Sequence, residues 1–402
     1  MSAAPFAFDL FAPGFAEDPY PDYARLRAEA PVHEHPLGFW ILSRHADVAA
    51  LQRSSHSVDE ANLTRLPAWK SDSATLGKAN RIMRGQSILD QDPPDHTRLR
   101  RLMAQAFTRR AVADRQPSIV AYVEAALDRI AEAGSADIVA ELAFPLPFAI
   151  ISEMLGIPVV ESTRVRELTA LMVLSLEPLA DPGLQTRIRA ASEELRAMIG
   201  EFVQWKRTHP GDDLLTALIS AEHDGDALTE DELIAQVMLL YVAGHETTVN
   251  HLSGGLLALL NHPGQAALLR SEPALAVNAV DELLRYDSPV HLMRRITVEP
   301  LIVGDIEIPS GSWVLACIAA ANRDAEFWGA DADELRINRP NAAQHGSFGA
   351  GAHHCLGAAL VRLEGSATFA AFVRRFPQAL VEEVRWNGRI NVRGPAQLIV
   401  TV

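Results

Sequence analysis

Cysteine is scarce in this chain, and its scarcity limits the kinds of site that the protein can build. Cys317 and Cys355 are the only two cysteines among 402 residues, too few for a disulfide framework or a four-cysteine metal site. Such usage is typical of a reducing compartment, so we expect a cytoplasmic protein. The setting of each cysteine is therefore informative.

Long apolar runs and an excess of positive charge are also missing. The run at 237–243 falls far short of the ~20 residues that cross a bilayer. The N-terminus lacks a basic leading segment and carries Asp9 in its apolar stretch, which is not typical of a signal peptide. A formal net charge of −15 disfavours nucleic acid and anionic membranes as partners. We expect a small molecule or a protein as the partner instead.

Helical periodicity dominates what is present. Apolar residues recur at three- and four-residue spacing at 99–107, 118–133, 141–155, 186–206, 229–262, 274–286 and 357–375. Strand patterns are shorter, at 39–42, 301–308 and 313–317, with a turn at 309–311 between the last two. Because no repeat or Ser/Gly-rich linker occurs, we predict a mainly α protein with one domain over 1–402, its first 16 residues irregular.

One predicted helix is interrupted by polar residues near its middle. Thr229 and Glu232 form a capping-box pattern at its start, and Pro263 marks its far end. The first half is apolar on nearly every face, as in a helix that is buried all round. A polar stretch follows: Ala243, Gly244, His245, Glu246, Thr247 and Thr248.

Two interpretations of this polar stretch are open. In the structural one, Thr247 bonds back to a backbone carbonyl and Glu246 meets a basic partner. In the functional one, a loosened helical turn leaves room for a diatomic ligand, and Glu246 and Thr247 relay protons to it.

An acid and a base stand three residues apart on the segment 276–286. Glu282 and Arg285 project from one helical face among apolar neighbours. If the pair is buried, the planar fork of Arg285 would bridge Glu282 to the backbone or to a second acid. We interpret this pair as structural.

Glycines crowd the sequence around Cys355, at positions 346, 349, 351 and 357. They allow tight backbone conformations and close approach to a flat object. We predict that Cys355 opens a helix, where free N–H groups stabilise a thiolate. Iron that cleaves an O–O bond requires such a ligand, because the sulfur pushes electron density onto the metal.

Other interpretations of these cysteines compete. A small buried hydrophobe is the simplest account of Cys317. Zinc bound by His353, His354 and Cys355 is an alternative, although consecutive residues rarely converge on one tetrahedral metal. A cysteine nucleophile with a distant histidine remains the competing class of enzyme.

Taken together, these segments resemble the cytochrome P450 family, and the haem domain of the soluble bacterial type in particular. The similarity runs from about residue 17 to the end. The haem-ligand signature of that family is similar to Phe348-Gly349-x-Gly351-x-His353-x-Cys355-x-Gly357. Its oxygen-binding motif is similar to Ala243-Gly244-x-Glu246-Thr247-Thr248, and its structural pair to Glu282-x-x-Arg285.

The resemblance implies roles for individual residues. Cys355 would ligate the iron of a non-covalent haem b, with Phe348, Gly349 and Gly357 shaping the loop. Its propionates would be held by His96, Arg100, His353 and Arg294, the last chosen by its spacing to Thr297. Arg339 would complete the network of Glu282 and Arg285.

The resemblance also implies a reaction. A haem-thiolate monooxygenase would insert one oxygen atom from O₂ into a small, largely apolar substrate by hydroxylation or epoxidation. Ala243, Gly244, Glu246 and Thr247 would bind O₂ and manage protons. Because the chain ends soon after the cysteine helix, we expect electrons, ultimately from NAD(P)H, to arrive through a separate ferredoxin. We also expect a monomer. A haem-based sensor remains the non-enzymatic alternative, although a sensor does not need a proton relay.

Substrate and partner surfaces are less specific. We expect pocket residues in about 60–90, 168–185, 290–293 and 390–394, with an apolar lining from Leu89, Leu240, Ala243, Val290 and Leu292. Core packing would explain each of these five residues equally well. A basic cluster contains arginines 98, 100, 101, 109, 110 and 115, and either forms a solvated face or docks an acidic ferredoxin.

Overall fold

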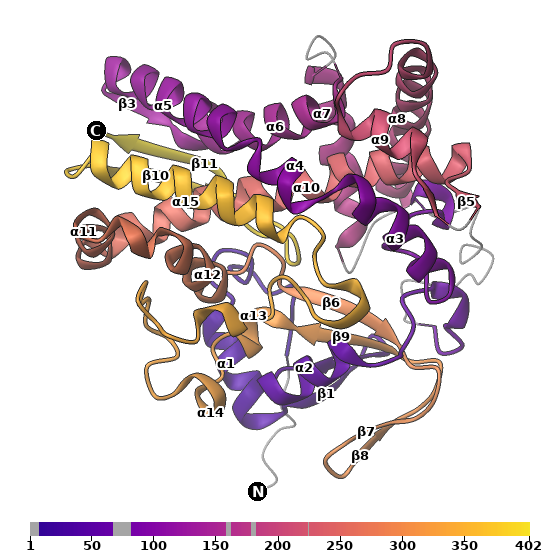
Figure 1. Cartoon of the computed structure of the whole chain (residues 1–402). Helices are drawn as coiled ribbons and strands as arrows, with labels where there is room; N and C mark the ends of the chain where they lie inside the picture. The colour runs from indigo at the N-terminus through magenta and orange to yellow at the C-terminus, as the bar shows by residue number, and fades with distance from the viewer. Residues whose placement is uncertain (1–7, 67–81, 158–161, 178–181, 224) are drawn as a thin grey trace, which may run out of the picture.

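The computed structural model describes residues 8–66, 82–157, 162–177, 182–223 and 225–402 (Figure 1). Helices make up most of this part of the chain. The α-helices are α1 Tyr20–Glu29, α2 His45–Arg53, α3 Asp95–Ala106, α4 Arg109–Ala113, α5 Gln116–Ala133, α6 Pro145–Leu155, α7 Ser162–Val173, α8 Pro182–Thr208, α9 Leu214–Ser220, α10 Glu230–Asn261, α11 Pro263–Ser271, α12 Ala276–Tyr286, α13 Ile318–Ala321, α14 Ala325–Trp328 and α15 Ala358–Arg375. The predicted mainly α fold is therefore confirmed.

Strands are short and gather into small sheets. They are β1 Val32–His35, β2 Phe39–Leu42, β3 Ser135–Asp137, β4 Glu222–His223, β5 Asp226–Ala227, β6 Leu292–Ile296, β7 Leu301–Val303, β8 Ile306–Ile308, β9 Trp313–Cys317, β10 Leu380–Trp386 and β11 Pro395–Thr401. The largest sheet has the order β1-β2-β9-β6, with β9 parallel to β2 and antiparallel to β6. A second sheet has the order β10-β11-β3, and β4-β5 and β7-β8 are separate hairpins.

Helix α10 is the centre of the fold. Its start has the predicted capping box, because Thr229 and Glu232 each accept the other's backbone N–H. The helix ends at Asn261, next to the predicted stop at Pro263, and its 32 residues correspond to about 48 Å at ~1.5 Å per residue. Apolar side chains of α10 pack against those of α6, α8, α12 and α15 in the main core.

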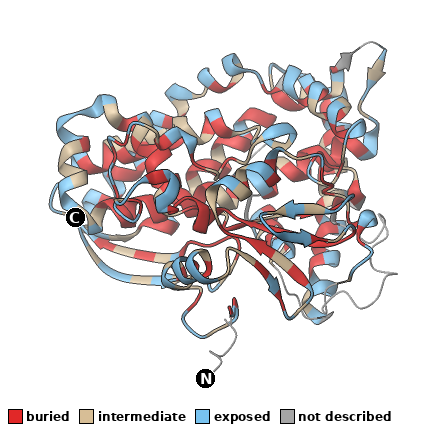
Figure 2. Cartoon of the chain, turned by 90° about the horizontal axis from the view of Figure 1, so that it is seen from below, coloured by how far each residue is buried: buried red, intermediate tan, exposed pale blue. Residues whose placement is uncertain are grey.

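The four-stranded sheet lies on the other side of the molecule from most of these helices (Figure 1). Figure 2 shows that buried residues follow the central helices and this sheet, while exposed residues cover the outer helices. Along the described ranges, we find no helix with the length and apolarity that a membrane span requires.

One predicted strand proved to be two. The segment 301–308 forms the hairpin β7-β8, with Val303 opposite Ile306. Gly304 has a φ of +59°, the left-handed conformation that a two-residue turn requires, so the chain reverses there. The turn at 309–311 connects β8 to β9. These two strands do not pair with each other, because β9 pairs with β2 and β6.

Candidate active site

A cavity of about 950 Å³ is lined on one side by α10 and on another by the loop 347–357. Most of its lining is apolar, with basic groups near Cys355 and further polar side chains at 175–193. All five residues predicted to line a substrate pocket do border it: Leu89, Leu240, Ala243, Val290 and Leu292. Leu89 is also 44% exposed, so it lies at the rim. Two parts of the predicted pocket segments, 67–81 and 178–181, lie outside the described residues.

The cysteine loop is held by its own backbone. The N–H of Cys355 donates to the carbonyl of Phe348 at 2.8 Å, which closes the loop. Gly349 has a φ of +66°, and a Cβ there would lie 3.0 Å from the methyl carbon of Met293. A side chain at 349 would therefore be strained and crowded.

The environment of Cys355 differs in part from the prediction. Helix α15 begins at Ala358, because Leu356 and Gly357 form a turn after the cysteine. The backbone N–H groups of Gly357 and Ala358 lower the pKa of the Cys355 thiol as expected of a helix start, but burial raises it more. The Cys355 thiol is therefore harder to ionise than the sequence suggested.

Cys317 has the simple role that the sequence indicated. It is fully buried on β9 within an apolar cluster. Burial raises the pKa of its thiol to about 12, so the thiol stays protonated and unreactive.

Basic side chains gather at the polar end of the cavity. The rings of His96 and His353 lie 4.1 Å apart, and burial followed by the charge of His96 lowers the pKa of His353 to about 3. Arg100 and Arg295 also act on both histidines, and Arg100 donates to the carbonyl of His354 at 2.6 Å. The buried Nε2 of His96 has no partner among the described residues. An anionic group would stabilise such a cluster.

Arg294, which was predicted for this cluster, borders the cavity together with Arg295 but has acidic partners. Its guanidinium pairs with Glu60 at 2.6 Å and lies 3.8 Å from Asp90. Arg295 is only 6% exposed, and its charge acts on His96 and His353. Because successive side chains of a strand point to opposite faces, these two neighbouring arginines have different partners, and we expect Arg295 rather than Arg294 to act with the two histidines.

The polar stretch of α10 has the contacts of the structural interpretation. Thr247 donates to the carbonyl of Ala243 at 2.7 Å, and Thr248 to that of Gly244 at 3.0 Å. The predicted loosened turn is not found, because α10 continues as α-helix through this stretch. Ala243, Gly244 and Thr247 nevertheless line the cavity.

Glu246 lies apart from these three residues. Its carboxylate pairs with Arg389 at 2.6 Å, and the side chain is 14% exposed. Among the described residues, those that line the cavity do not include Glu246. In this conformation the acid is therefore engaged away from the cavity.

Glu282 and Arg285 form the centre of a buried network. Both side chains are fully buried and meet through two hydrogen bonds of 2.7 and 2.8 Å. Arg285 also donates to backbone carbonyls of Asn322, Ala332 and Glu334, which fixes the chain that leads to the cysteine loop. Arg339 joins the network at 3.2 Å from Glu282.

A hydrogen-bonded clasp between Glu177 and residues 390–392 lies at the edge of the cavity, and the sequence analysis did not predict it. The Glu177 carboxylate accepts the backbone N–H groups of Ile390, Asn391 and Val392 at 2.9 to 3.0 Å. The Asn391 side chain donates to the carbonyl of Leu176 and accepts from the N–H of Leu292. A single glutamate in an apolar segment carries no sequence signal of such a role, because its partners lie more than 200 residues away.

Comparison with known proteins identifies the family. A family model described as cytochrome P450 matches residues 53–387. The chain belongs to the cytochrome P450 family. Cytochrome P450 107B1 of Saccharopolyspora erythraea is 39% identical over 97% of this chain and 96% of its own length. Vitamin D(3) 25-hydroxylase of Pseudonocardia autotrophica is 36% identical over 98% of this chain and 96% of its own length.

A solved structure agrees with this cytochrome P450 over most of its length. P450BioI in complex with an acyl carrier protein that carries hexadec-9Z-enoic acid superimposes with a TM-score of 0.89 at 30% identity. The match covers 96% of this chain and 98% of that one. The protein is thus an oxidoreductase of this family, and membership favours the haem interpretation of Cys355 over zinc and over a nucleophile.

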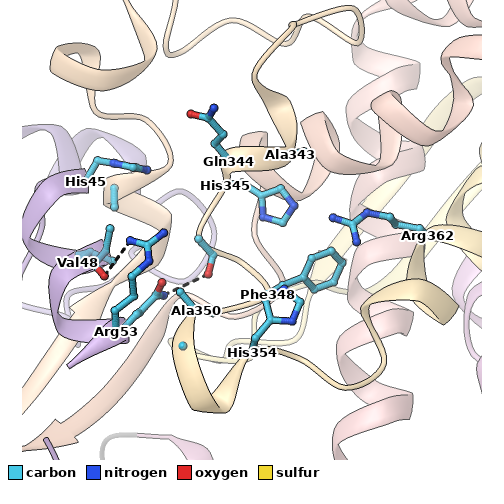
Figure 3. Close-up of a pocket in the computed structure, with 16 residues that line it drawn as sticks. His45, Val48, Arg53, Ala343, Gln344, His345, Phe348, Ala350, His354 and Arg362 are labelled. Atoms are coloured by element: carbon cyan, nitrogen blue, oxygen red, sulfur yellow. Dashed lines mark hydrogen bonds between the residues drawn. The ribbon is translucent and has the colours of Figure 1, made fainter. Parts of the chain in front are cut away.

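A second hollow of this cytochrome P450 borders the same cysteine loop (Figure 3). It has a volume of about 400 Å³ and is lined by α2, by 343–351 and by Arg362. Figure 3 shows Arg53, His354 and Arg362 around it. The hollow therefore presents two guanidinium groups, those of Arg53 and of Arg362, and Arg362 pairs with Asp281 at 2.8 Å.

Proposed function

We propose that this cytochrome P450 is a haem-thiolate monooxygenase that inserts one oxygen atom from O₂ into a small, largely apolar molecule. The observation that carries the proposal is one cavity that is bordered by a cysteine thiol, a cluster of basic side chains and an apolar wall. Hydroxylation of an unactivated C–H bond or epoxidation of a C=C bond is the reaction that such a site would serve.

The side chains of this site match the groups that a bound haem would need, namely hydrogen-bond donors for two propionates and a ligand for the iron. The unpartnered Nε2 of His96 and the cluster of Arg100, Arg295 and His353 would receive the two propionates. Cys355 would ligate the iron, with Phe348, Gly349 and Gly357 around the sulfur. Bound haem would supply the metal at which O₂ is activated.

Residues of α10 would organise the opposite wall. Ala243 and Gly244 leave space because they carry little or no side chain. The Thr247 hydroxyl now donates to the carbonyl of Ala243, and by rotating it would donate to an oxygen bound in the cavity. Glu246 would need to leave Arg389 before it served that hydroxyl.

The apolar lining supports an apolar substrate. Ile151, Met172, Leu240, Val290 and Leu292 border the cavity, and burial of apolar surface would drive binding. Two similar proteins support the same class, one named for a vitamin D(3) hydroxylase activity and one seen with a fatty acyl chain.

A separate ferredoxin would deliver the electrons. The hollow in Figure 3 and the exposed Arg101 and Arg109 of α3 and α4 offer positive charge to an acidic partner. NAD(P)H would then act only through the reductase of that ferredoxin.

One spectrum tests the proposal. Haem-supplied protein that is reduced and treated with carbon monoxide should show the red-shifted band of thiolate-ligated haem. Cys355→Ala should lose the band, and Cys317→Ala should keep it because Cys317 lies on β9, in an apolar cluster of its own. Protein that stays colourless, or a band that survives Cys355→Ala, would contradict the proposal.

A further inference from the structure

The carboxylate of Asp281, on α12, holds two side chains that flank the cysteine loop. Its Oδ1 accepts hydrogen bonds from Nε of Arg362 at 2.8 Å and from Nε2 of His345 at 3.3 Å. The Asp281 side chain is only 7% exposed, so water competes little for these contacts. No role was predicted for any of these three residues from the sequence.

His345 and Arg362 both lie against Phe348, the first aromatic residue of the loop. The guanidinium carbon of Arg362 lies 4.7 Å from the centre of the Phe348 ring, and the centres of the His345 and Phe348 rings are 5.1 Å apart. Figure 3 shows the two side chains beside that ring. Because the carbonyl of Phe348 accepts the N–H of Cys355, the contacts of Asp281 lead to the backbone that carries the sulfur.

His345 connects Asp281 to the start of the loop without adding a charge. Burial lowers the pKa of His345, although the hydrogen bond with Asp281 opposes that change, so the ring is neutral near pH 7. Its Nδ1 accepts the backbone N–H of Ser347 at 3.1 Å. The proton of the neutral ring is therefore on Nε2, which donates it to Asp281.

Asp281 and Arg362 form a pair of opposite charges. Burial raises the pKa of Asp281, but His345 and Arg362 together lower it by more, so the carboxylate is ionised near pH 7. The guanidinium of an arginine is always charged at this pH. The pair therefore has no net charge, and either residue alone would leave one.

The charge of Arg362 reaches the sulfur of Cys355. Burial raises the pKa of the Cys355 thiol, and the charge of Arg362 lowers it, as do the N–H of Gly357 and the charge of Arg100. A positive charge that favours a thiolate would also favour the additional electron of a reduced iron bound to that sulfur. Groups beside a metal ligand adjust the potential of a metal in this way.

We propose that Asp281 is a positioning residue that sets the reduction potential of the bound haem, because it holds Arg362 against Phe348 and neutralises the guanidinium. The inference rests on the proposed function, since it requires iron at Cys355. The step concerned is the transfer of one electron from the proposed ferredoxin to that iron, with no proton. The pair keeps the potential below the value that an unpaired Arg362 would give.

Two single variants should shift the potential in opposite directions. In Asp281→Asn the amide oxygen still accepts from Arg362, so the guanidinium stays in place uncompensated and the reduced state should gain about tenfold. In Arg362→Gln the charge of Asp281 remains alone, so the reduced state should lose about tenfold. Each tenfold change corresponds to about 59 mV for a one-electron couple.

A spectroelectrochemical titration of haem-loaded, substrate-free protein would measure these potentials. The double variant, Asp281→Asn with Arg362→Gln, removes both charges and should return to within about twofold of the wild type. Damage to the packing of the loop would not give two shifts of opposite sign that cancel. The pattern therefore distinguishes an effect of charge from an effect of folding.

An exposed pair on the same helix provides the matched control. Arg374, near the end of α15, pairs with Glu124 at 2.8 Å, and both side chains are at least 41% exposed. Glu124→Gln and Arg374→Gln make the same two changes of charge. Each should alter the ratio of reduced to oxidised protein by less than about twofold, because solvent and salt screen exposed charges.

Unchanged potentials in both single variants would overturn the proposal, and so would shifts of the same sign or equal shifts in the two control variants. If Asp281→Asn does not bind haem, Arg362→Gln alone decides, and a potential that does not fall overturns the proposal.

The carbon monoxide band separates this inference from the proposed function. Wild type that shows the band, together with variants that show it at an unshifted potential, would remove the inference and leave the proposed function standing. Wild type without the band would remove both.

Discussion

Arg294 and Arg295 differ by one position along the chain but have different neighbours. Arg294 is neutralised by Glu60 and Asp90, and Arg295 lies with His96 and His353. A single residue therefore decides which guanidinium faces the proposed propionates. Glu246 and Glu364 also differ in their environments, because Glu246 pairs with Arg389 whereas burial raises the pKa of Glu364. Burial and partners, not residue type, therefore set what each acid can do.

Substitution of the two arginines should separate their roles. Arg295→Gln should speed haem loss by about ten- to a hundredfold, because a charged hydrogen bond contributes ~1.5–3 kcal/mol. Arg294→Gln should change haem loss much less. Haem transfer to apomyoglobin would measure both rates, and a larger effect of Arg294→Gln would contradict the assignment.

The raised pKa of Glu364 has a consequence for stability. Because the folded protein holds this proton more tightly than the unfolded chain, the contribution to stability is full below about pH 4.5 and is lost as the pH rises to about 8. The slope is about 1.4 kcal/mol per pH unit across that range.

Glu364→Gln should remove this slope. Chemical denaturation of haem-loaded wild type and variant between pH 5 and 8 would measure it, with the variant gaining relative stability as the pH rises. Parallel stability curves for the two proteins would rule out a raised pKa at Glu364.

At the scale of elements, the loop between β10 and β11 is held by the side chain of Glu177, which is distant in the sequence. The tip of the β10-β11 hairpin is bound at three backbone N–H groups by Glu177 and contacts α10 through Asn250 and through Arg389. This hairpin therefore links the part of the cavity wall near Glu177 to α10, the helix that carries the proposed oxygen site.

Glu177→Gln should loosen that loop. The glutamine side chain would place an NH₂ group against the backbone N–H donors and weaken this contact by ~1.5–3 kcal/mol. Hydrogen exchange of the backbone amides at 390–392 should therefore accelerate by about ten- to a hundredfold. Hydrogen exchange followed by mass spectrometry would detect it. Glu382→Gln, exposed on the same hairpin, should leave exchange unchanged, and equal protection in both variants would refute the clasp.

At the scale of the whole molecule, a buried ionic network connects α12 with the chain before the cysteine loop. Glu282 is the shared partner of Arg285 and Arg339, so its removal leaves the buried Arg285 without an acid and leaves Arg339 with Asp331 alone. The prediction of one domain over residues 1–402 stays a prediction.

Glu282→Gln should therefore destabilise the fold by about 3–5 kcal/mol. Glu29→Gln, which removes an exposed pair with Arg25, should cost less than about 1 kcal/mol. Thermal and urea unfolding would compare them. A mild effect of Glu282→Gln would mean that the network is not structurally important.

Long-range charge should govern electron delivery. Reversal at Arg101 and Arg109 should slow reduction by an acidic ferredoxin by about tenfold at low salt and flatten its salt dependence. Arg187→Glu on α8 is the exposed control. Stopped-flow reduction would measure the rates, and unchanged rates and salt dependence would favour a solvated basic face.

Local pattern alone determined much of this protein. We could predict the capping box of α10, the glycine-rich loop at Cys355 and the order of the three motifs, because each depends on residues that are neighbours in the chain. Residues 301–308 were misjudged because a two-residue turn at Gly304 interrupts an otherwise continuous strand pattern.

Only the tertiary structure decided which side chains meet. The Glu246–Arg389 pair joins residues 143 positions apart, and Arg295 reaches His96 across a comparable separation. The neutral state of Glu364 depends on burial between α10 and α15, which no single segment encodes. Contacts and protonation states are set by distance and solvent exclusion in space, so they became visible only once the chain was folded.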